Sequence, residues 1–276
     1  MSEPLSPRTP LSLLRTFPGF WSLSLILGAA IIPIFLCLPL LSLFVQVPFT
    51  ELAKRISSPV VLNALRLSLL TSFSSAVIIV VFGLPTAYFF ATSEFPGKRA
   101  LEVLMNLPMV LPPTVAGLGL LLAFGRSGLV GGWLARMGWS IPFSTVAVVL
   151  AQLFVATPFF VNAARSGFEA VDPHLLKAAS SLGASPFYCF LRIVLPLSSR
   201  SLAVGMAMAW ARSLGEFGAT ITFAGNLPGV TQTMPLAVYM AMQSDLQAAV
   251  ALSVLLLIVS FGILMALRTR VFLGPR

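Results

Sequence analysis

Hydrophobic residues lie along this chain in long runs that are separated by short polar stretches. Six of the runs are long enough to cross the hydrocarbon core of a membrane as helices, which takes about 20 consecutive apolar residues. They lie at about residues 20–45, 67–91, 103–124, 143–164, 199–224 and 246–267. The pattern predicts an all-α integral membrane protein in which residues 20–267 form one domain of six transmembrane helices.

Small and cyclic residues within the runs indicate where these helices bend and where they pack closely. Proline removes a backbone donor and tends to kink a helix. Prolines in or beside the runs are Pro33, Pro39, Pro85, Pro112 and Pro113. Glycines that permit close helix contact are Gly117, Gly119, Gly205 and Gly218.

The composition supports a membrane protein and argues against nucleic acid as a partner. Only 9% of the residues are charged and 58% are hydrophobic, whereas a soluble domain carries about 25% charged residues. The net charge of +9 comes from basic residues in separate loops at the ends of the runs. They form no continuous stripe that could follow a phosphate backbone. The composition therefore predicts that membrane lipid surrounds the protein.

The distribution of Lys and Arg predicts the orientation in the membrane. Six spans place both termini on one side. With cytoplasmic termini, the internal segments hold eleven basic residues and the external loops hold four, Lys54, Arg55, Arg126 and Arg136. Positive residues favour the cytoplasmic side, so we expect residues 1–19 and 268–276 to be cytoplasmic. The first run is longer than the apolar core of a signal peptide and is interpreted as a retained span.

The longest internal polar stretch, residues 165–198, carries the start signals of two short helices. Asp172 and Ser185 each precede a proline, as an N-cap residue does when proline occupies the first helical position. Gly183 is well placed to end the first helix in a left-handed conformation. The loop is therefore predicted to form two short helices joined by a sharp turn.

The first of these helices has a narrow apolar face. Leu175, Ala179 and Leu182 recur at helical spacing. Such a face packs either against the protein's own bundle or into a partner protein, and the residues alone leave both alternatives open.

Arg212 and Glu216 are charged residues well inside the fifth run. They are four residues apart, hence on one face of a continuous helix and able to pair. A charge at the bilayer centre costs about 3 kcal/mol on insertion scales, so such residues face a bundle interior or an aqueous path. The pair either fixes helix packing or lines a pathway. Arg212 attracts an anion and Glu216 opposes it, so the two do not form a high-affinity anion site.

Neutral hydrogen-bonding side chains follow the fifth run. Thr220, Asn226 and Gln232 suit a transient path for an oxyanion, because conduction requires binding weak enough to permit release. The alternative is a polar external turn built by Pro228 and Gly229.

The loop also carries a family resemblance. Residues 177–183, read as KAASSLG and followed after nine residues by IVLP at 193–196, resemble the EAA loop of permease subunits of binding-protein-dependent ABC importers. In that family the loop is a coupling helix that fits a cleft in a cytoplasmic ATPase. The resemblance implies that Lys177, Ala178, Ala179 and Gly183 contact the ATPase. Lys177 departs from the family pattern, which has glutamate there.

More specific segments resemble the molybdate-type permeases of this family, to which tungstate and sulfate permeases are closely related. They are residues 215–220, 223–229 and 231–236, and, near the third run, 111–115 and 125–128. The resemblance implies the ABC importer permease fold in a prokaryotic inner membrane and two copies of the chain around one pathway. It also implies two ATPase subunits, which hold ATP and Mg, and an extracytoplasmic binding protein that delivers molybdate.

The chain itself is not expected to bind a cofactor or to catalyse a reaction. Gly97-Lys98-Arg99 lacks the earlier glycine and the following Ser or Thr of a phosphate-binding loop. His174 is the only histidine, and no catalytic constellation or metal-ligand cluster is recognisable. An ion-coupled secondary anion transporter would tolerate the embedded charges of the fifth run, but it gives no reason for the two capped cytoplasmic helices.

Overall fold

A computed structural model describes residues 19–46 and 58–272 of the chain. It divides into two units, residues 1–48 and 49–276, which are described separately. The described part of the first unit, residues 19–46, forms helix α1 (Gly19–Val45), with Pro33 and Pro39 inside it. All regular elements among the described residues are helical, as predicted. The outer parts of the predicted terminal segments, residues 1–18 and 273–276, lie outside the described residues.

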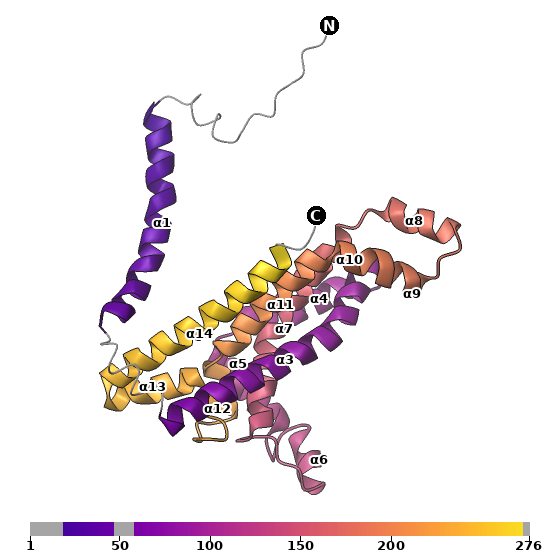
Figure 1. Cartoon of the computed structure of the whole chain (residues 1–276). Coiled ribbons are helices and arrows are strands. Elements are labelled where there is room, and N and C mark those ends of the chain that lie inside the picture. The colour runs from indigo at the N-terminus through magenta and orange to yellow at the C-terminus, as the bar shows by residue number, and fades with distance from the viewer. Residues whose placement is uncertain (1–18, 47–57, 273–276) are drawn as a thin grey trace. The chain divides into compact units, whose positions relative to one another are not determined.

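The second unit is a bundle of long helices with shorter helices at both ends (Figure 1). The long helices are α3 (Pro59–Thr92), α7 (Thr145–Glu169), α11 (Ser199–Leu214) and α14 (Leu246–Phe272). The shorter ones are α4 (Lys98–Val110), α5 (Pro113–Phe124), α6 (Gly131–Arg136), α8 (Pro173–Ser181), α9 (Pro186–Cys189), the π-helical η2 (Phe190–Val194), α10 (Leu195–Leu197), α12 (Gly218–Phe223) and α13 (Met234–Ser244). Helices α8 and α9 project from one end of the bundle and α6 from the other.

Four of the described helices, α1, α3, α7 and α14, are long and apolar enough to cross a membrane singly. Two bent pairs bring the number to six if each pair forms one span. In one, α4 and α5 meet at 116°, and in the other, residues 186–197 and α11 meet at 70°. The structure is therefore compatible with six spans, but two of them are not single straight helices.

The third run, residues 103–124, was predicted as one span, and in the structure it forms the bent pair α4–α5 rather than one straight helix. The break falls at Leu111 and Pro112, both with extended backbone, before Pro113 begins α5. A residue that precedes proline is forced away from the helical region, and proline itself has no donor to continue the ladder. Two consecutive prolines therefore end α4 and redirect the chain.

The prediction of a continuous helix over 199–224 was also wrong. Helix α11 ends at Leu214, and α12 starts only at Gly218. Gly215 and Glu216 lie in the break between them.

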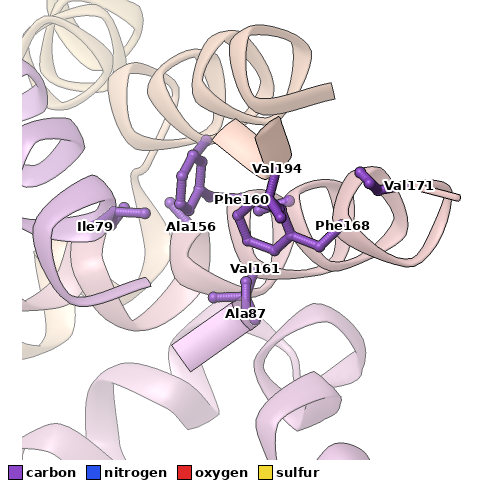
Figure 2. Close-up of a cluster of buried hydrophobic side chains, with 10 residues drawn as sticks. Ile79, Ala87, Ala156, Phe160, Val161, Phe168, Val171 and Val194 are labelled. Atoms are coloured by element: carbon purple, nitrogen blue, oxygen red, sulfur yellow. The ribbon is translucent and has the colours of Figure 1, made fainter. Parts of the chain in front are cut away.

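The core of the second unit lies where α7 packs against α3 and α11 (Figure 2). Phe160 and Val161 of α7 are fully buried there, with Ile79 from α3 and Val194 from η2. Small residues allow the close approach, because a Cβ at Gly83 of α3 would lie 2.9 Å from the Phe160 ring. A fully buried aromatic or branched side chain contributes about 1.5 to 3 kcal/mol relative to exposure to water, and helices in lipid also gain from this close packing.

Candidate functional site

The segment between α7 and η2 has the two capped helices and the turn that the sequence predicted. The Asp172 carboxylate Oδ1 accepts a hydrogen bond from the His174 N–H at 2.8 Å and caps α8. Ser185 Oγ accepts one from the Tyr188 N–H at 3.2 Å and caps α9. Gly183 has φ +85°, in the left-handed region that disfavours larger residues. Because α7 continues to Glu169, this segment is shorter than the predicted loop 165–198.

The apolar residues of this segment remain largely uncovered. Leu182 is 89% exposed, and Leu175 and Phe187 are exposed as well. Leu176 is the residue of α8 that packs against the buried core. Lys177 and Ala178 are exposed and Ala179 is half-buried. The bundle therefore covers one edge of α8 and leaves an apolar surface free for a partner.

Arg212 and Glu216 form an ion pair across the end of α11. Arg212 Nη1 lies 2.7 Å from Glu216 Oε2. The other carboxylate oxygen, Oε1, accepts a hydrogen bond from the Ala219 N–H at 2.7 Å in the first turn of α12. From the part of the chain that the structure describes, Oε2 accepts no hydrogen bond of directional geometry, so its contact with Arg212 is one of charge. The pairing was predicted, but Glu216 lies in the break and joins α11 to α12.

The two charges differ in their access to the surroundings. The Glu216 side chain is 1% exposed and that of Arg212 is 28% exposed. No other hydrogen bond or ion pair engages the Arg212 guanidinium among the described residues, so its remaining N–H groups are available. The buried carboxylate holds the cation in place, and the cation is the more accessible member of the pair.

The other predicted pathway residues lie near this pair in sequence but are not bonded to it among the described residues. Thr220, in α12, is fully buried, and its hydroxyl has no hydrogen-bond partner there. Asn226 is half-buried with an unpartnered Oδ1, and Gln232 is buried. The predicted turn between them is present, because the Leu227 carbonyl accepts from the N–H groups of residues 230–232. The same turn is closed by the Leu227 N–H, which donates to Thr231 Oγ1 at 2.8 Å.

Helix α12 is packed tightly against α5. A Cβ at Gly117 of α5 would lie 2.7 Å from the Ala219 carbonyl oxygen, and a Cβ at Gly218 would lie 2.6 Å from Pro113 Cβ. Glycines on both sides thus permit the contact that the sequence predicted for them. Gly119 has nothing within 4 Å of an added Cβ among the described residues of this chain, so its predicted close contact stays a prediction.

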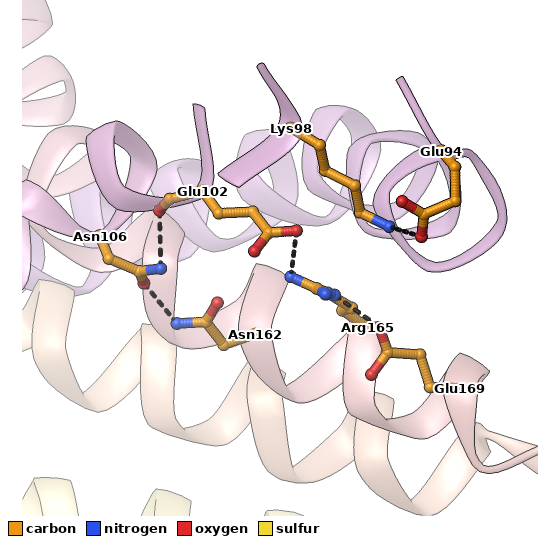
Figure 3. A network of polar contacts seen from close by, with 7 residues as sticks. All are labelled: Glu94, Lys98, Glu102, Asn106, Asn162, Arg165 and Glu169. Carbon is orange, nitrogen blue, oxygen red and sulfur yellow. Dashed lines mark hydrogen bonds and ion pairs between the residues drawn. The ribbon is translucent and has the colours of Figure 1, made fainter. Parts of the chain in front are cut away.

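A polar network joins α4 to α7, and the sequence analysis missed it (Figure 3). The Arg165 guanidinium lies 2.9 Å from Glu102 of α4 through Nη1, and its Nε donates to Glu169 at 2.6 Å. One turn further along, Asn162 Nδ2 donates to Asn106 Oδ1 at 2.6 Å. Two asparagines inside apolar runs were the available signal, because a polar amide in a membrane helix normally finds a partner.

The network borders a polar cavity of about 400 Å³ at the start of α4. Lys98 lies over it and pairs with Glu94 at 2.7 Å, and Arg99 is a further cation of its lining. The Lys98 ammonium holds the pKa of the Glu94 carboxyl below its ordinary value. Glu94 therefore stays ionised at neutral pH, and this pair is lost only as the pH falls through the lowered pKa.

A second buried polar contact joins α3 to α7. Gln152 of α7 accepts from Ser75 Oγ at 2.9 Å and donates to Thr71 Oγ1 at 3.1 Å. All three side chains are buried. Their mutual hydrogen bonds remove the penalty of burying polar groups in an apolar bundle.

Comparison with known proteins relates the chain to transport permeases. The family model of binding-protein-dependent transport system inner membrane components matches residues 79–272. The molybdenum transport system permease protein ModB of Mycobacterium tuberculosis is 42% identical over 241 residues, which cover 87% of this chain and 91% of that protein. The sulfate transport system permease protein CysT of Escherichia coli is 35% identical, with 92% and 93% covered.

Solved structures show the same fold at low sequence identity. A bacterial ABC transporter involved in the import of the acidic polysaccharide alginate matches with a TM-score of 0.74 at 16% identity, over 93% of this chain and 96% of that one. The methionine ABC transporter MetNI, in an inward-facing conformation, matches with a TM-score of 0.63 at 17% identity, over 79% and 97%. The ABC importer permease fold that the sequence predicted is therefore confirmed.

Proposed function

The chain belongs to the family of binding-protein-dependent transport system inner membrane components, and from this premise we propose that the cargo it carries is molybdate. Membership makes the chain a multi-pass, non-catalytic permease subunit of an ABC importer in the inner membrane. The observation that carries the choice of cargo is the 42% identity to ModB over most of both chains, against 35% to CysT. A tungstate or a sulfate importer is the alternative, because these oxyanions share charge and shape.

We propose the assembly that such a subunit requires. Two copies of the chain surround one pathway, two cytoplasmic ATPase subunits bind ATP and Mg, and an extracytoplasmic protein delivers the oxyanion. The exposed side of α8 and the turn after it, with Lys177, Ala178, half-buried Ala179 and Gly183, dock on the ATPase. Its uncovered leucines support this, because apolar surface outside the membrane is costly unless a partner covers it. Both termini are then cytoplasmic, on the side of α8.

Arg212 is the residue proposed to face the oxyanion in the pathway. Its guanidinium has free N–H groups, while the charge of Glu216 beside it limits how tightly an anion is held. Half-exposed Asn226 adds a neutral contact. Thr220 and Gln232 are buried within the subunit, so their contribution is to hold α12 and the following turn in position. Weak binding of this kind suits conduction, and selectivity is assigned mainly to the binding protein.

Uptake by the reconstituted complex tests the cargo. The permease is purified with its ATPase, placed in vesicles, and supplied with its own binding protein and ATP. We expect uptake of radiolabelled molybdate that requires ATP hydrolysis and that excess tungstate suppresses more than excess sulfate does. Uptake of sulfate in preference to molybdate would overturn the assignment, and uptake without ATP would support a secondary transporter.

Two glycine substitutions test the role of residues 170–189 between α7 and η2, called the α8 segment below. Gly183 and Gly138 both have positive φ and open space around a Cβ, but they lie in the α8 segment and in the α5–α7 connection. Gly183→Val should leave the permease inserted and should reduce transport by about fivefold or more, since distorting a coupling element costs at least about 1 kcal/mol of coupling energy. Gly138→Val carries the same backbone strain and should transport normally. Equal transport by the two variants would contradict the coupling role.

A further inference from the structure

We propose that Arg165 is a positioning residue, which transmits movement of the α8 segment to α4 through its ion pair with Glu102. The inference rests on the proposed docking of α8 on an ATPase. Arg165 lies one turn before the end of α7, and α8 begins four residues after that end. A displacement of α8 therefore acts first on the part of α7 that carries Arg165.

The Arg165 side chain is divided between two carboxylates (Figure 3). Its Nε donates to Glu169 within α7, and its Nη1 pairs with Glu102 of α4. The side chains of Arg165 and Glu102 are 27% and 25% exposed. At this depth the pair is desolvated enough to contribute to the position of α4, but it still lies within reach of water. Such a contact can break and form again, whereas separating a fully buried pair is far more costly.

Helix α4 has little else that fixes its position. Its described residues are at most half-buried, with Met105 packed against the core around Phe160, and the helix packs mainly on α7. The polar contacts that join it to α7 among the described residues are the Glu102 pair and the hydrogen bonds from Asn162 to Asn106 and to Met109 Sδ. Because little apolar surface is lost when α4 shifts, these few polar contacts determine where it rests.

Movement of α4 has a direct route to the proposed pathway. The end of α4 leads through the 116° bend into α5. Helix α5 is locked against α12 by Gly117 and Gly218. The first turn of α12 is bonded to Glu216, which holds Arg212. Because close contacts join α5, α12 and Glu216, a displacement of α4 that reaches α5 through the bend moves these elements together and so reaches Arg212.

Two single substitutions separate the link between helices from the link within α7. Glu102→Gln removes the ion pair between Arg165 and α4. Glu169→Gln removes the ion pair of Arg165 within α7. Both substitutions leave Arg165 in place. The complex in vesicles is assayed for basal ATP hydrolysis and for its stimulation by the binding protein loaded with molybdate. We expect Glu102→Gln to keep basal hydrolysis and to lose about fivefold in stimulation and uptake, as changes along a coupling route do. Glu169→Gln should retain both.

A charge exchange covers the possibility that Glu102→Gln fails to assemble. Glu102→Arg, combined with Arg165→Glu and Glu169→Gln, restores the pair between the helices with reversed polarity. We expect the loaded binding protein to stimulate ATP hydrolysis more in this triple variant than in Glu102→Arg alone. If the triple variant shows no such gain, the inference is overturned. Full stimulation in Glu102→Gln, or an equal loss in Glu169→Gln, would also overturn it. If the wild-type complex shows no stimulation by the loaded binding protein, the proposed function fails and the inference fails with it.

Discussion

The two halves of the bent pair, α4 and α5, are attached to the protein in different ways. Helix α5 buries Ala116, Gly117 and Leu120 and contacts α12 at distances that exclude any larger side chain at its glycine. Helix α4 buries none of its residues and is joined to α7 by polar side chains. Close apolar packing has one good arrangement, whereas ion pairs between long side chains tolerate several. The comparison indicates that α5 behaves as one rigid unit with α12, whereas α4 can shift relative to α7.

The largest loss of stability is expected when the Arg212–Glu216 pair is broken, because Glu216 holds α12 and α12 packs against α5. Arg212→Gln leaves the Glu216 carboxylate buried without its cation and should cost about 3 to 5 kcal/mol of stability. Glu216→Gln should cost less, because the Arg212 guanidinium is partly exposed. The double variant should be more stable than the sum of the two losses predicts. Unfolding of detergent-extracted protein measures this, and additive losses would contradict the pairing.

A second substitution acts on α5 itself. Gly117→Val places a branched side chain against the Ala219 carbonyl and should destabilise the protein by about 1 to 3 kcal/mol, as overpacking does. Gly119→Val is the matched control, because it lies on the same helix with nothing within 4 Å of its Cβ. Thermal denaturation in detergent distinguishes the two. A stable Gly117→Val variant would show that α5 is not locked to α12.

Breaking the amide contact of α4 should affect stability much less. Asn162→Ala removes the hydrogen bond to Asn106 and should cost about 0.6 kcal/mol, the average for hydrogen bonds between membrane helices. Thermal denaturation in detergent measures this loss. Asn162→Asp is not a suitable substitution, because it introduces a charge. A loss as large as that of Gly117→Val would mean that α4 is held as firmly as α5.

The smallest effect is expected at the start of α4. The Glu94 side chain is 88% exposed, and its pair with Lys98 lies within one turn. Glu94→Gln should leave stability and transport unchanged, because exposed pairs contribute little. A clear loss of uptake would show that the cavity beside Lys98 contributes to transport.

Local chemistry in the sequence predicted the α8 segment in detail. Asp172, Ser185 and Gly183 act within a few residues of themselves, through caps and a left-handed turn, so no distant partner is needed to interpret them. The apolar runs likewise predicted the fold class, because spanning the membrane depends on length and hydrophobicity. The resemblance to molybdate-type permeases added the family, which the comparisons support.

The errors arose where averaged hydrophobicity conceals a break in the backbone. The apolar run over residues 103–124 continues through Leu111 and Pro112, although their extended dihedral angles end the helix. Gly215 and Glu216 separate α11 from α12, although Arg212 and Glu216 were interpreted as a pair on one continuous helix. The α4–α7 network was missed because Asn106 and Asn162 are 56 residues apart. Such a contact depends on tertiary packing, which helical periodicity does not reveal.

Distances between spin labels test most directly whether α4 moves while its surroundings stay fixed. Labels at Leu101 of α4 and Ser166 of α7 report on the movable contact, and labels at Phe82 of α3 and Ser166 report on the fixed one. The label sites are exposed, and Cys37 and Cys189 are first replaced by serine. Each complex contains one doubly labelled subunit and one unlabelled subunit.

The measurement compares the resting complex with one trapped by ATP and vanadate. We expect the α4–α7 distance to change by more than about 2 Å, beyond the small shifts of packed helices, and the α3–α7 distance to remain constant. Equal behaviour of the two distances, whether both change or both stay constant in the trapped complex, would contradict a movable α4.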